Sequence, residues 1–157
     1  MNAGVTEILI LLLAVALLVA AAGDNKIRTI PNWQNRAIAL AALPFWWVLG
    51  LPLWPEIAIQ IGVALGGFAL FALAFHLGAM GGGDVKLVSA LALWLPPLAV
   101  IKLFIIMSLA GGVLTAVMLA RHRLSKSTHI LEIPYGVAIA FAGLWLLGEP
   151  YLNQFAQ

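Results

Sequence analysis

Apolar residues lie in six long runs along the chain, and short polar segments separate them. The hydrocarbon core of a membrane is about 30 Å thick, and a helix needs about 20 apolar residues to cross it. The runs cover residues 5–22, 37–53, 57–80, 85–95, 98–120 and 133–147. This pattern predicts an all-α integral membrane bundle of about six transmembrane helices, organised as a single transmembrane domain over residues 1–157. The fourth run is short for a crossing, so we expect its polar flank to lie slightly inside the membrane edge.

The composition excludes an ordinary water-soluble domain. Hydrophobic residues make up 64% of the chain and charged residues only 9%, and the mean hydropathy is +1.07. Soluble domains carry about 25% charged residues, and disordered chains combine low hydrophobicity with high charge. The chain has no cysteine, which excludes disulfides, a thiol nucleophile and a cysteine-based zinc site.

The basic residues predict how the bundle is oriented, because membrane proteins keep Lys and Arg in their cytoplasmic loops. Seven of the eight basic residues fall in or beside the loops after the first, third and fifth runs, and only Lys102 falls near the other face. The seven are Lys26, Arg28, Arg36, Lys86, Arg121, Arg123 and Lys126. We therefore expect both the N-terminus and the C-terminus outside. The net charge of +2 then reflects orientation and contact with membrane lipid, and we expect no nucleic-acid partner.

Two aspartates stand at the cytoplasmic end of this predicted bundle. Asp24 directly follows the first apolar run, and Asp84 follows the third run behind Gly81, Gly82 and Gly83. Ionisable groups at or inside a membrane are costly and mark candidate functional sites. Two carboxylates held close together share one proton. Such a pair suits hydrolysis, in which one carboxylate activates a water molecule and the other protonates the carbonyl oxygen or the leaving amine. The three glycines, which have no side chains, would let a substrate backbone approach Asp84 closely.

Other interpretations of the two aspartates remain open. Each could simply cap or solvate a helix end, although a plain cap needs no run of three glycines before it. A small proton-coupled transporter or channel component would use the acids as a relay, which favours acids spread across the membrane depth rather than gathered at one edge. A non-enzymatic assembly scaffold has no obvious use for the glycine string.

Three polar residues flank the aspartates and could shape the site. Lys86 could tune the charge of the pair or anchor the membrane edge, and Arg28 could act in the same way near Asp24. Asn32 follows Pro31, which biases the chain before it toward an extended conformation and so shapes the entry into the second run. The two histidines of the last basic loop have no partner at metal-ligand spacing. Since water serves as the nucleophile, we expect no metal ion and no organic cofactor.

Three strings, in this order, carry a resemblance to a known family. Asp24 stands six residues before the string Ile-Pro-Asn at residues 30–32, and Asp84 lies in the string Gly-Gly-Gly-Asp-Val-Lys-Leu. Residues 132–140 read Glu-Ile-Pro-Tyr-Gly-Val-Ala-Ile-Ala. The chain resembles the type IV prepilin peptidase family, whose members are membrane aspartyl proteases of the G-x-G-D kind. The resemblance covers residues 24–140, and it maps the two catalytic aspartates of that family onto Asp24 and Asp84.

The resemblance implies a specific function. Members of the family cleave the leader peptide from prepilins or pilin-like single-span precursors at the inner face of the cytoplasmic membrane. The chain would therefore be a multi-pass aspartic endopeptidase of the bacterial cytoplasmic (inner) membrane, acting in a type IV pilus system. Larger members carry a cytoplasmic insert, often with paired cysteines, that is linked to N-methylation of the new pilin end. The short first loop and the lack of cysteine are similar to the small, peptidase-only branch found with tight-adherence (Flp-type) pili, for which no methyltransferase activity is expected.

Reporter fusions test the predicted orientation. A reporter fused after Arg123 should lie in the cytoplasm, and one fused after Gln157 should lie outside, as an even number of crossings requires. Paired fusions to alkaline phosphatase, which is active outside, and to a fluorescent protein, which folds inside, measure both positions. A cytoplasmic position for Gln157 would mean an odd number of crossings and would remove the basis for placing Asp24 and Asp84 on one face.

Overall fold

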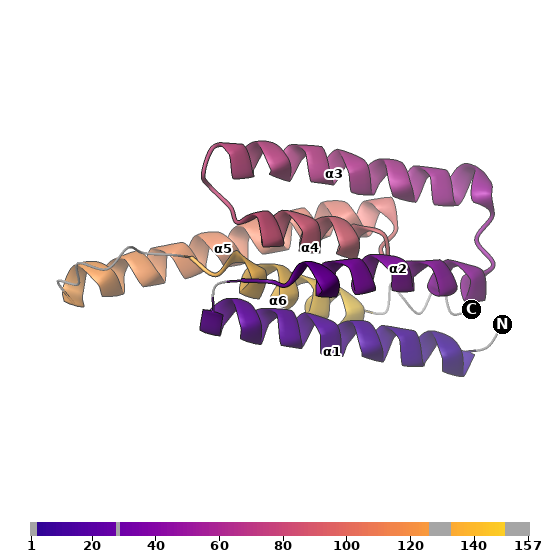
Figure 1. The fold of residues 1–157 in the computed structure, drawn as a ribbon, viewed down its shortest axis with the longest axis horizontal. Helices are drawn as coiled ribbons and strands as arrows, with labels where there is room; N and C mark the ends of the chain where they lie inside the picture. The colour runs from indigo at the N-terminus through magenta and orange to yellow at the C-terminus, as the bar shows by residue number, and fades with distance from the viewer. Residues whose placement is uncertain (1–2, 28, 126–132, 150–157) are drawn as a thin grey trace.

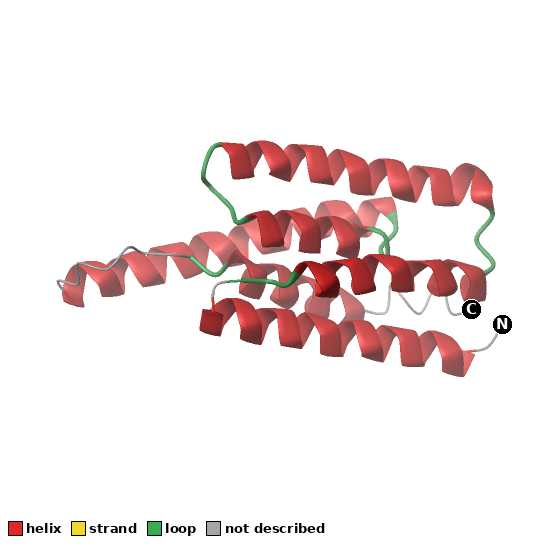
Figure 2. Ribbon diagram, viewed as in Figure 1, coloured by secondary structure: helices red, strands yellow, loops and turns green. Residues whose placement is uncertain are grey.

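All regular structure in the described part of the chain is helical (Figure 2). The computed structural model describes residues 3–27, 29–125 and 133–149. In chain order, its helices are α1 (Ala3–Ile27), α2 (Asn32–Leu49), α3 (Ala58–His76), α4 (Gly82–Ala92), α5 (Pro97–Ser125) and α6 (Tyr135–Gly148). A short irregular helical segment, η1 (Leu53–Ile57), leads into α3. The predicted all-α fold is confirmed, with one helix for each of the six apolar runs.

Three helical stretches are long and apolar enough to cross a membrane, and they are Gly4–Lys26, Leu53–His76 and Pro97–His122. The apolar helix α6 is shorter, with 14 residues. With 11 residues, α4 is only about 16 Å long. Large apolar side chains point away from the bundle on the long helices, Leu11, Leu65 and Leu109 among them. Such a surface suits lipid rather than water, and the chain is a helical membrane bundle.

Both aspartates lie inside helices and not in the loops that the apolar runs predicted. α1 continues to Ile27, beyond the predicted end at Ala22, and so contains Asp24 in its last turns. α4 begins at Gly82, ahead of the predicted start at residue 85, and so contains Asp84 in its first turn. Hydropathy assigns polar residues to loops even where the backbone stays helical. Helix ends are where this happens, because polar side chains there bond to the free backbone groups.

α4 and α6 form the middle of the bundle (Figure 1). α1 packs along α6 and α2, while α2 and α3 both pack on α4, and α5 packs along α6. Successive helices alternate in direction, so the end of α1 lies at the same end of the bundle as the start of α4. α5 extends beyond its neighbours at this end. The largest fully buried side chains are Leu17, Leu87, Leu91, Leu95, Leu103, Ile139, Leu146, Val88 and Val100.

Side chains from neighbouring helices donate hydrogen bonds to the backbone carbonyl groups at the far end of α4. Backbone groups at a helix end have no partner within the helix, and inside a membrane there is little water to replace one. The indole N–H of Trp46 on α2 donates to the carbonyl oxygen of Leu93 at 2.9 Å. The amide of Gln60 on α3 donates to the carbonyl oxygen of Leu95 at 3.2 Å. These two bonds allow α4 to end inside the bundle although it is too short to cross a membrane.

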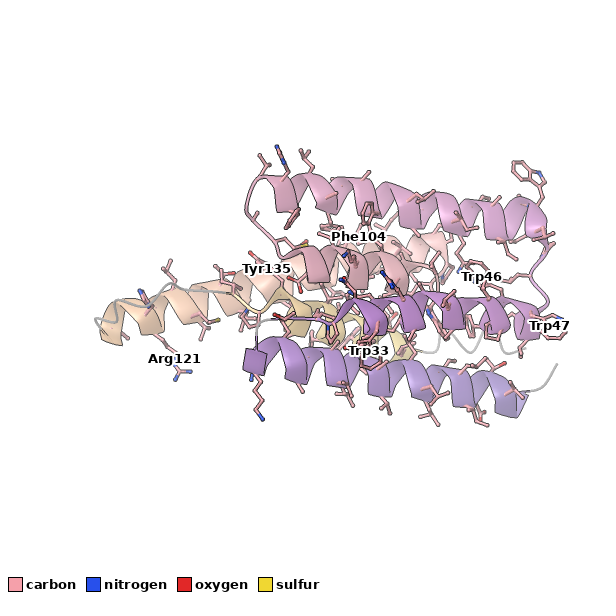
Figure 3. All side chains as sticks on the ribbon, in the orientation of Figure 1. Trp33, Trp46, Trp47, Phe104, Arg121 and Tyr135 are labelled. Atoms are coloured by element: carbon pink, nitrogen blue, oxygen red, sulfur yellow. The ribbon has the colours of Figure 1, made fainter. Side chains whose placement is uncertain are left out.

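The two ends of the bundle carry different side chains (Figure 3). Arg121 lies near the end of α5 that extends beyond the other helices, and Lys86 is exposed at the start of α4. At the opposite end, Trp47 is exposed near the end of α2, and Lys102 forms an ion pair of 3.2 Å with Glu149. Lys86 and Arg121 thus lie at one end of the bundle, and the cytoplasmic orientation of that end stays a prediction from charge.

Candidate active site

The structure brings Asp24 and Asp84 together from opposite parts of the chain. The end of α1 and the start of α4 lie at the same end of the bundle (Figure 1), and each helix carries one of the carboxylates. Asp24 is 5% exposed and Asp84 is 6% exposed, so both are buried. They lie close enough for the negative charge of Asp24 to repel that of Asp84. Two buried acids in electrostatic contact are costly in an apolar bundle, and they form the centre of the candidate site.

Asp84 is held by the first turn of its own helix. The backbone N–H of Gly81 donates a hydrogen bond of 3.2 Å to Asp84 Oδ2. In return, the backbone N–H of Asp84 donates to the carbonyl oxygen of Gly81 at 3.1 Å. A Cβ atom at Gly81 would lie 2.8 Å from Asp84 Oδ2, a distance that real side chains do not reach. The glycine therefore allows Asp84 to cap its helix while it belongs to the carboxylate pair.

Gly136, in the first turn of α6, lies against both aspartates. Its backbone N–H interacts with the carboxylate of Asp84. A Cβ atom on Gly136 would lie 2.8 Å from Asp24 Oδ2 and 3.0 Å from Asp24 Cβ. α6 thus contributes a backbone hydrogen-bond donor to Asp84, and the missing side chain of Gly136 leaves room for Asp24. Sequence reasoning did not select Gly136 as a site residue, although it stands in the Pro-Tyr-Gly part of the third string that carried the family resemblance.

The glycines before Asp84 serve packing, and this differs from the role that the sequence predicted for them. A Cβ atom at Gly83 would lie 3.2 Å from Ile30 Cβ and 3.4 Å from the carbonyl oxygen of Ile30. A Cβ atom at Gly82 would lie 3.4 Å from the ring of Phe75. The space beside Gly83 is therefore filled by the loop between α1 and α2, and not left open to a substrate backbone. The physical reason is that Ile30 is itself buried and needs a flat surface to pack on.

Asn35 fastens this first turn of α4 to α2. Its side-chain amide donates a hydrogen bond of 3.1 Å to the carbonyl oxygen of Gly83. Asn35 is buried, and a buried amide that bonds a backbone group next to Asp84 restrains the position of the acid. Sequence reasoning missed it. Asn35 stands two residues before the second apolar run, in a polar segment that hydropathy assigns to a loop, so no signal in the sequence marks its burial.

Lys86 and Asn32 form a pair on the other side of α4. Lys86 Nζ donates to Asn32 Oδ1 at 2.8 Å, and both residues are exposed. Residues two apart on a helix point to different sides, so Lys86 points away from the buried face that carries Asp84. The pair therefore joins α2 to α4 at the membrane edge. Arg28, the other basic residue expected to shape the site, lies outside the described residues.

The described residues suit acid–base chemistry. Across residues 3–27, 29–125 and 133–149, no group of three or more His, Cys, Asp or Glu side chains lies together as metal ligands would. Two neighbouring carboxylates can hold one proton between them. A pair in that state can take a proton from water and give one to a leaving group, which is what hydrolysis of a peptide bond requires.

Comparison with known proteins identifies the family of the chain. The sequence profile of the type IV leader peptidase family matches residues 11–116, which is more than half of the chain and includes Asp24 and Asp84. Searches among curated proteins and among solved structures give no match. The chain therefore belongs to the type IV leader peptidase family and is a membrane peptidase.

Proposed function

We propose that the chain is an aspartic endopeptidase that cleaves the leader peptide from prepilin or pilin-like precursors at the cytoplasmic face of the membrane. Asp24 and Asp84 are its catalytic residues. The observation that carries the proposal is the meeting of two buried carboxylates, from the end of α1 and the start of α4, in a chain of a leader peptidase family. The peptidase is a single transmembrane domain over residues 1–157, and it crosses the bacterial cytoplasmic (inner) membrane several times.

The proposed reaction uses water as the nucleophile. One carboxylate of the pair takes a proton from the water, which then attacks the carbonyl carbon of the scissile peptide bond. The other carboxylate, protonated, gives its proton to the carbonyl oxygen, which forms a gem-diol. As the C–N bond breaks, the first carboxyl gives the proton that it took from water to the leaving amine, and the second takes a proton back from a hydroxyl of the gem-diol, so the pair ends in its starting state. Gly81 and Gly136 hold Asp84 through their backbone N–H groups. This support fixes the carboxylate without another charged side chain.

The distribution of charge supports a cytoplasmic site. Lys26, Arg36 and Lys86 are exposed at the end of the bundle where the two aspartates meet. Glu56 is exposed at the opposite end, in η1. Basic residues stay on the cytoplasmic side of a membrane. Single-span precursors with a cytoplasmic leader present their cleavage site at this face.

The rival function, a proton-coupled transporter or channel component, finds less support. A proton relay needs titratable groups at successive depths. Within the described residues, Asp24 and Asp84 are the buried acids, and both lie at one end of the bundle. The other buried polar side chains are Thr6, Gln34, Asn35 and Gln60, which do not titrate in the relevant range.

Neutralising either aspartate tests the catalytic pair. Asp24→Asn and Asp84→Asn keep the size of the side chain but cannot transfer the proton, so each should lower cleavage by about 10²–10⁴-fold. The measurement is the gel shift of a tagged pilin-like precursor with one apolar span, co-expressed with each variant, beside an immunoblot of the peptidase in the membrane. Glu7→Gln and Glu56→Gln, exposed acids at the opposite end, are the matched controls and should cleave normally. Near-normal cleavage by either aspartate variant contradicts the two-carboxylate mechanism.

A single methyl group at Gly136 should also abolish most activity. In Gly136→Ala the new Cβ atom would lie 2.8 Å from Asp24 Oδ2 and 3.0 Å from Asp24 Cβ, so Asp24 must shift from its position in the pair. A displacement of about 1 Å in a catalytic group costs on the order of a hundredfold in rate. Gly148→Ala is the control, because Gly148 is in the same helix and has nothing within 4 Å of a Cβ position. If the two variants cleave the precursor equally well, Gly136 does not position the pair.

Gly83 offers a test of the packing role. A leucine at this position would push Ile30 away from α4 and disturb the loop that follows Asp24, so Gly83→Leu should lose most cleavage, by roughly tenfold or more. Gly112→Leu, in α5, places the same side chain in open space and should leave cleavage unchanged. The comparison is made at equal membrane levels of the two variants. Full activity of Gly83→Leu would show that the first loop does not hold the site.

A further inference from the structure

A long apolar groove runs along the face of α4 that points away from the aspartates. α2 and α3 both pack on α4 but make little contact with each other, and the space between them has a volume of about 580 Å³. One side of the groove is the α2 stripe of Ala39, Leu43 and Trp46, and the other side includes Leu65 and Phe68 of α3. The floor is the exposed edge of α4. The candidate reaction described above makes no use of this surface.

The residues that line the groove follow the helical repeat on each of the three helices. The lining residues on α2 begin at Asn32 and recur once every turn, singly or as adjacent pairs, up to Trp46, which makes a stripe about 21 Å long. Lining residues on α3 and α4 recur in the same way, from Ile61 to Phe68 and from Lys86 to Leu93. A groove walled by such stripes on three helices can accept the side-chain ridge of one more helix.

Small residues line the groove on all three helices. Ala39, Ala64, Ser89 and Ala90 face it from the three helices. Within a membrane, small residues let helix backbones approach closely, and this packing drives association because lipid removes any hydrophobic advantage. Flexible lipid chains do not need such a surface, whereas a transmembrane helix gains from it.

The polar end of the groove adjoins the candidate active site. Asn32, Arg36 and Lys86 line this end, and the remainder of the lining is largely apolar. Asn35 lines the groove as well, and its amide bonds the carbonyl oxygen of Gly83, the residue before Asp84. A helix in the groove would therefore leave the membrane at the same end of the bundle as the carboxylates, across α4 from them, at the face where its polar leader begins.

Two other apolar grooves lack the combination of an apolar lining with a charged end beside the candidate active site. One, of about 250 Å³, lies between α1 and α2, and another, of about 430 Å³, lies between α5 and α6. Neither is lined by a charged residue. Neither runs along α4, the helix that carries Asp84 in its first turn.

We propose that the groove between α2 and α3 binds the transmembrane helix of the precursor, with its cytoplasmic end beside Asn32 and Lys86. This inference rests on the proposed function, because it assigns a docking place to the single-span substrate. The substrate helix enters sideways from the lipid, packs on the small residues that line the groove, and presents the segment just outside its apolar span to Asp24 and Asp84. The depth at which the substrate helix lies in the groove, together with recognition of its side chains, then determines which peptide bond is cleaved.

Disulfide cross-linking tests the docking place, since the natural chain has no cysteine and each introduced one is unique. Leu40→Cys and Leu65→Cys place a thiol in the groove, while Leu12→Cys and Val113→Cys place one in the two other grooves. All four positions are 60–65% exposed, so their reactivity is matched. The probe is the pilin-like precursor that the wild-type chain cleaves, with single cysteines along its apolar span, co-expressed with each variant in an Asp84→Asn background and oxidised in membranes.

We expect cross-links from Leu40→Cys and Leu65→Cys, repeating every three to four positions along the precursor span, and none from the two controls. Equal or stronger cross-linking at Leu12→Cys or Val113→Cys overturns the inference. The absence of any cross-link from Leu40→Cys and Leu65→Cys also overturns it, because lipid alone would then occupy the groove. In each of those cases the proposed function stands as long as the wild-type chain cleaves the precursor. A precursor that the wild-type chain leaves uncut rejects the proposed function and the docking place with it.

Two alanines of α2 give a kinetic test in the intact enzyme. Ala39 and Ala41 are both half-buried, but Ala39 lines the proposed docking groove and Ala41 lines the groove between α1 and α2. Ala39→Phe should raise the KM for the precursor by roughly tenfold with little change in kcat, because it fills the binding site without touching the carboxylates. Ala41→Phe should leave KM unchanged. Equal KM values in the two variants overturn the inference.

Discussion

The structure depends on how a helix of 11 residues is held inside a membrane bundle. α4 is about half as long as a crossing, so its far end lies inside the bundle, where an unsatisfied backbone group costs several kcal/mol. At its first turn, Gly81 and Asp84 bond each other. At its far end, Trp46 and Gln60 donate to free carbonyl oxygens. Because those donors come from α2 and α3, they set the depth of α4 in the bundle and with it the depth of Asp84.

The candidate site also depends on two glycines, Gly83 and Gly136, against which Ile30 packs closely. Ile30 is buried between α4 and α6, where a Cβ atom at Gly83 would lie 3.2 Å from it and one at Gly136 would lie 2.8 Å from it. The loop after α1 can enter this space only because both positions lack a side chain. Asp24 stands six residues before Ile30, so the packing of this loop draws the end of α1 toward Asp84. The geometry of the carboxylate pair is thus a consequence of backbone packing, with Gly136 touching both acids.

α4 divides the proposed work of the peptidase between its two faces. Its buried face carries Asp84 toward α1 and α6, and its other face forms the floor of the groove between α2 and α3. A helix of this length can serve both purposes because its first turn lies at the membrane edge, where a substrate helix ends and its polar leader begins. The amide of Asn35, which lines the groove and bonds the carbonyl oxygen of Gly83, connects the two faces.

Hydropathy and charge were sufficient to predict a helical membrane bundle, and the two aspartates stood out because a charged residue at a membrane edge is costly. The strings around Asp24 and Asp84 also indicated the family that the profile match confirms. Helix ends were misplaced, since polar residues at the end of α1 and the start of α4 continue the helix instead of leaving it. The roles of Gly83, Asn35 and Gly136 emerged only from contacts between helices distant in the chain. A glycine can be accommodated in many backbone conformations, so the sequence alone does not show why it is there. Only the residues packed around it show whether the missing side chain makes room for a substrate, a loop or a carboxylate.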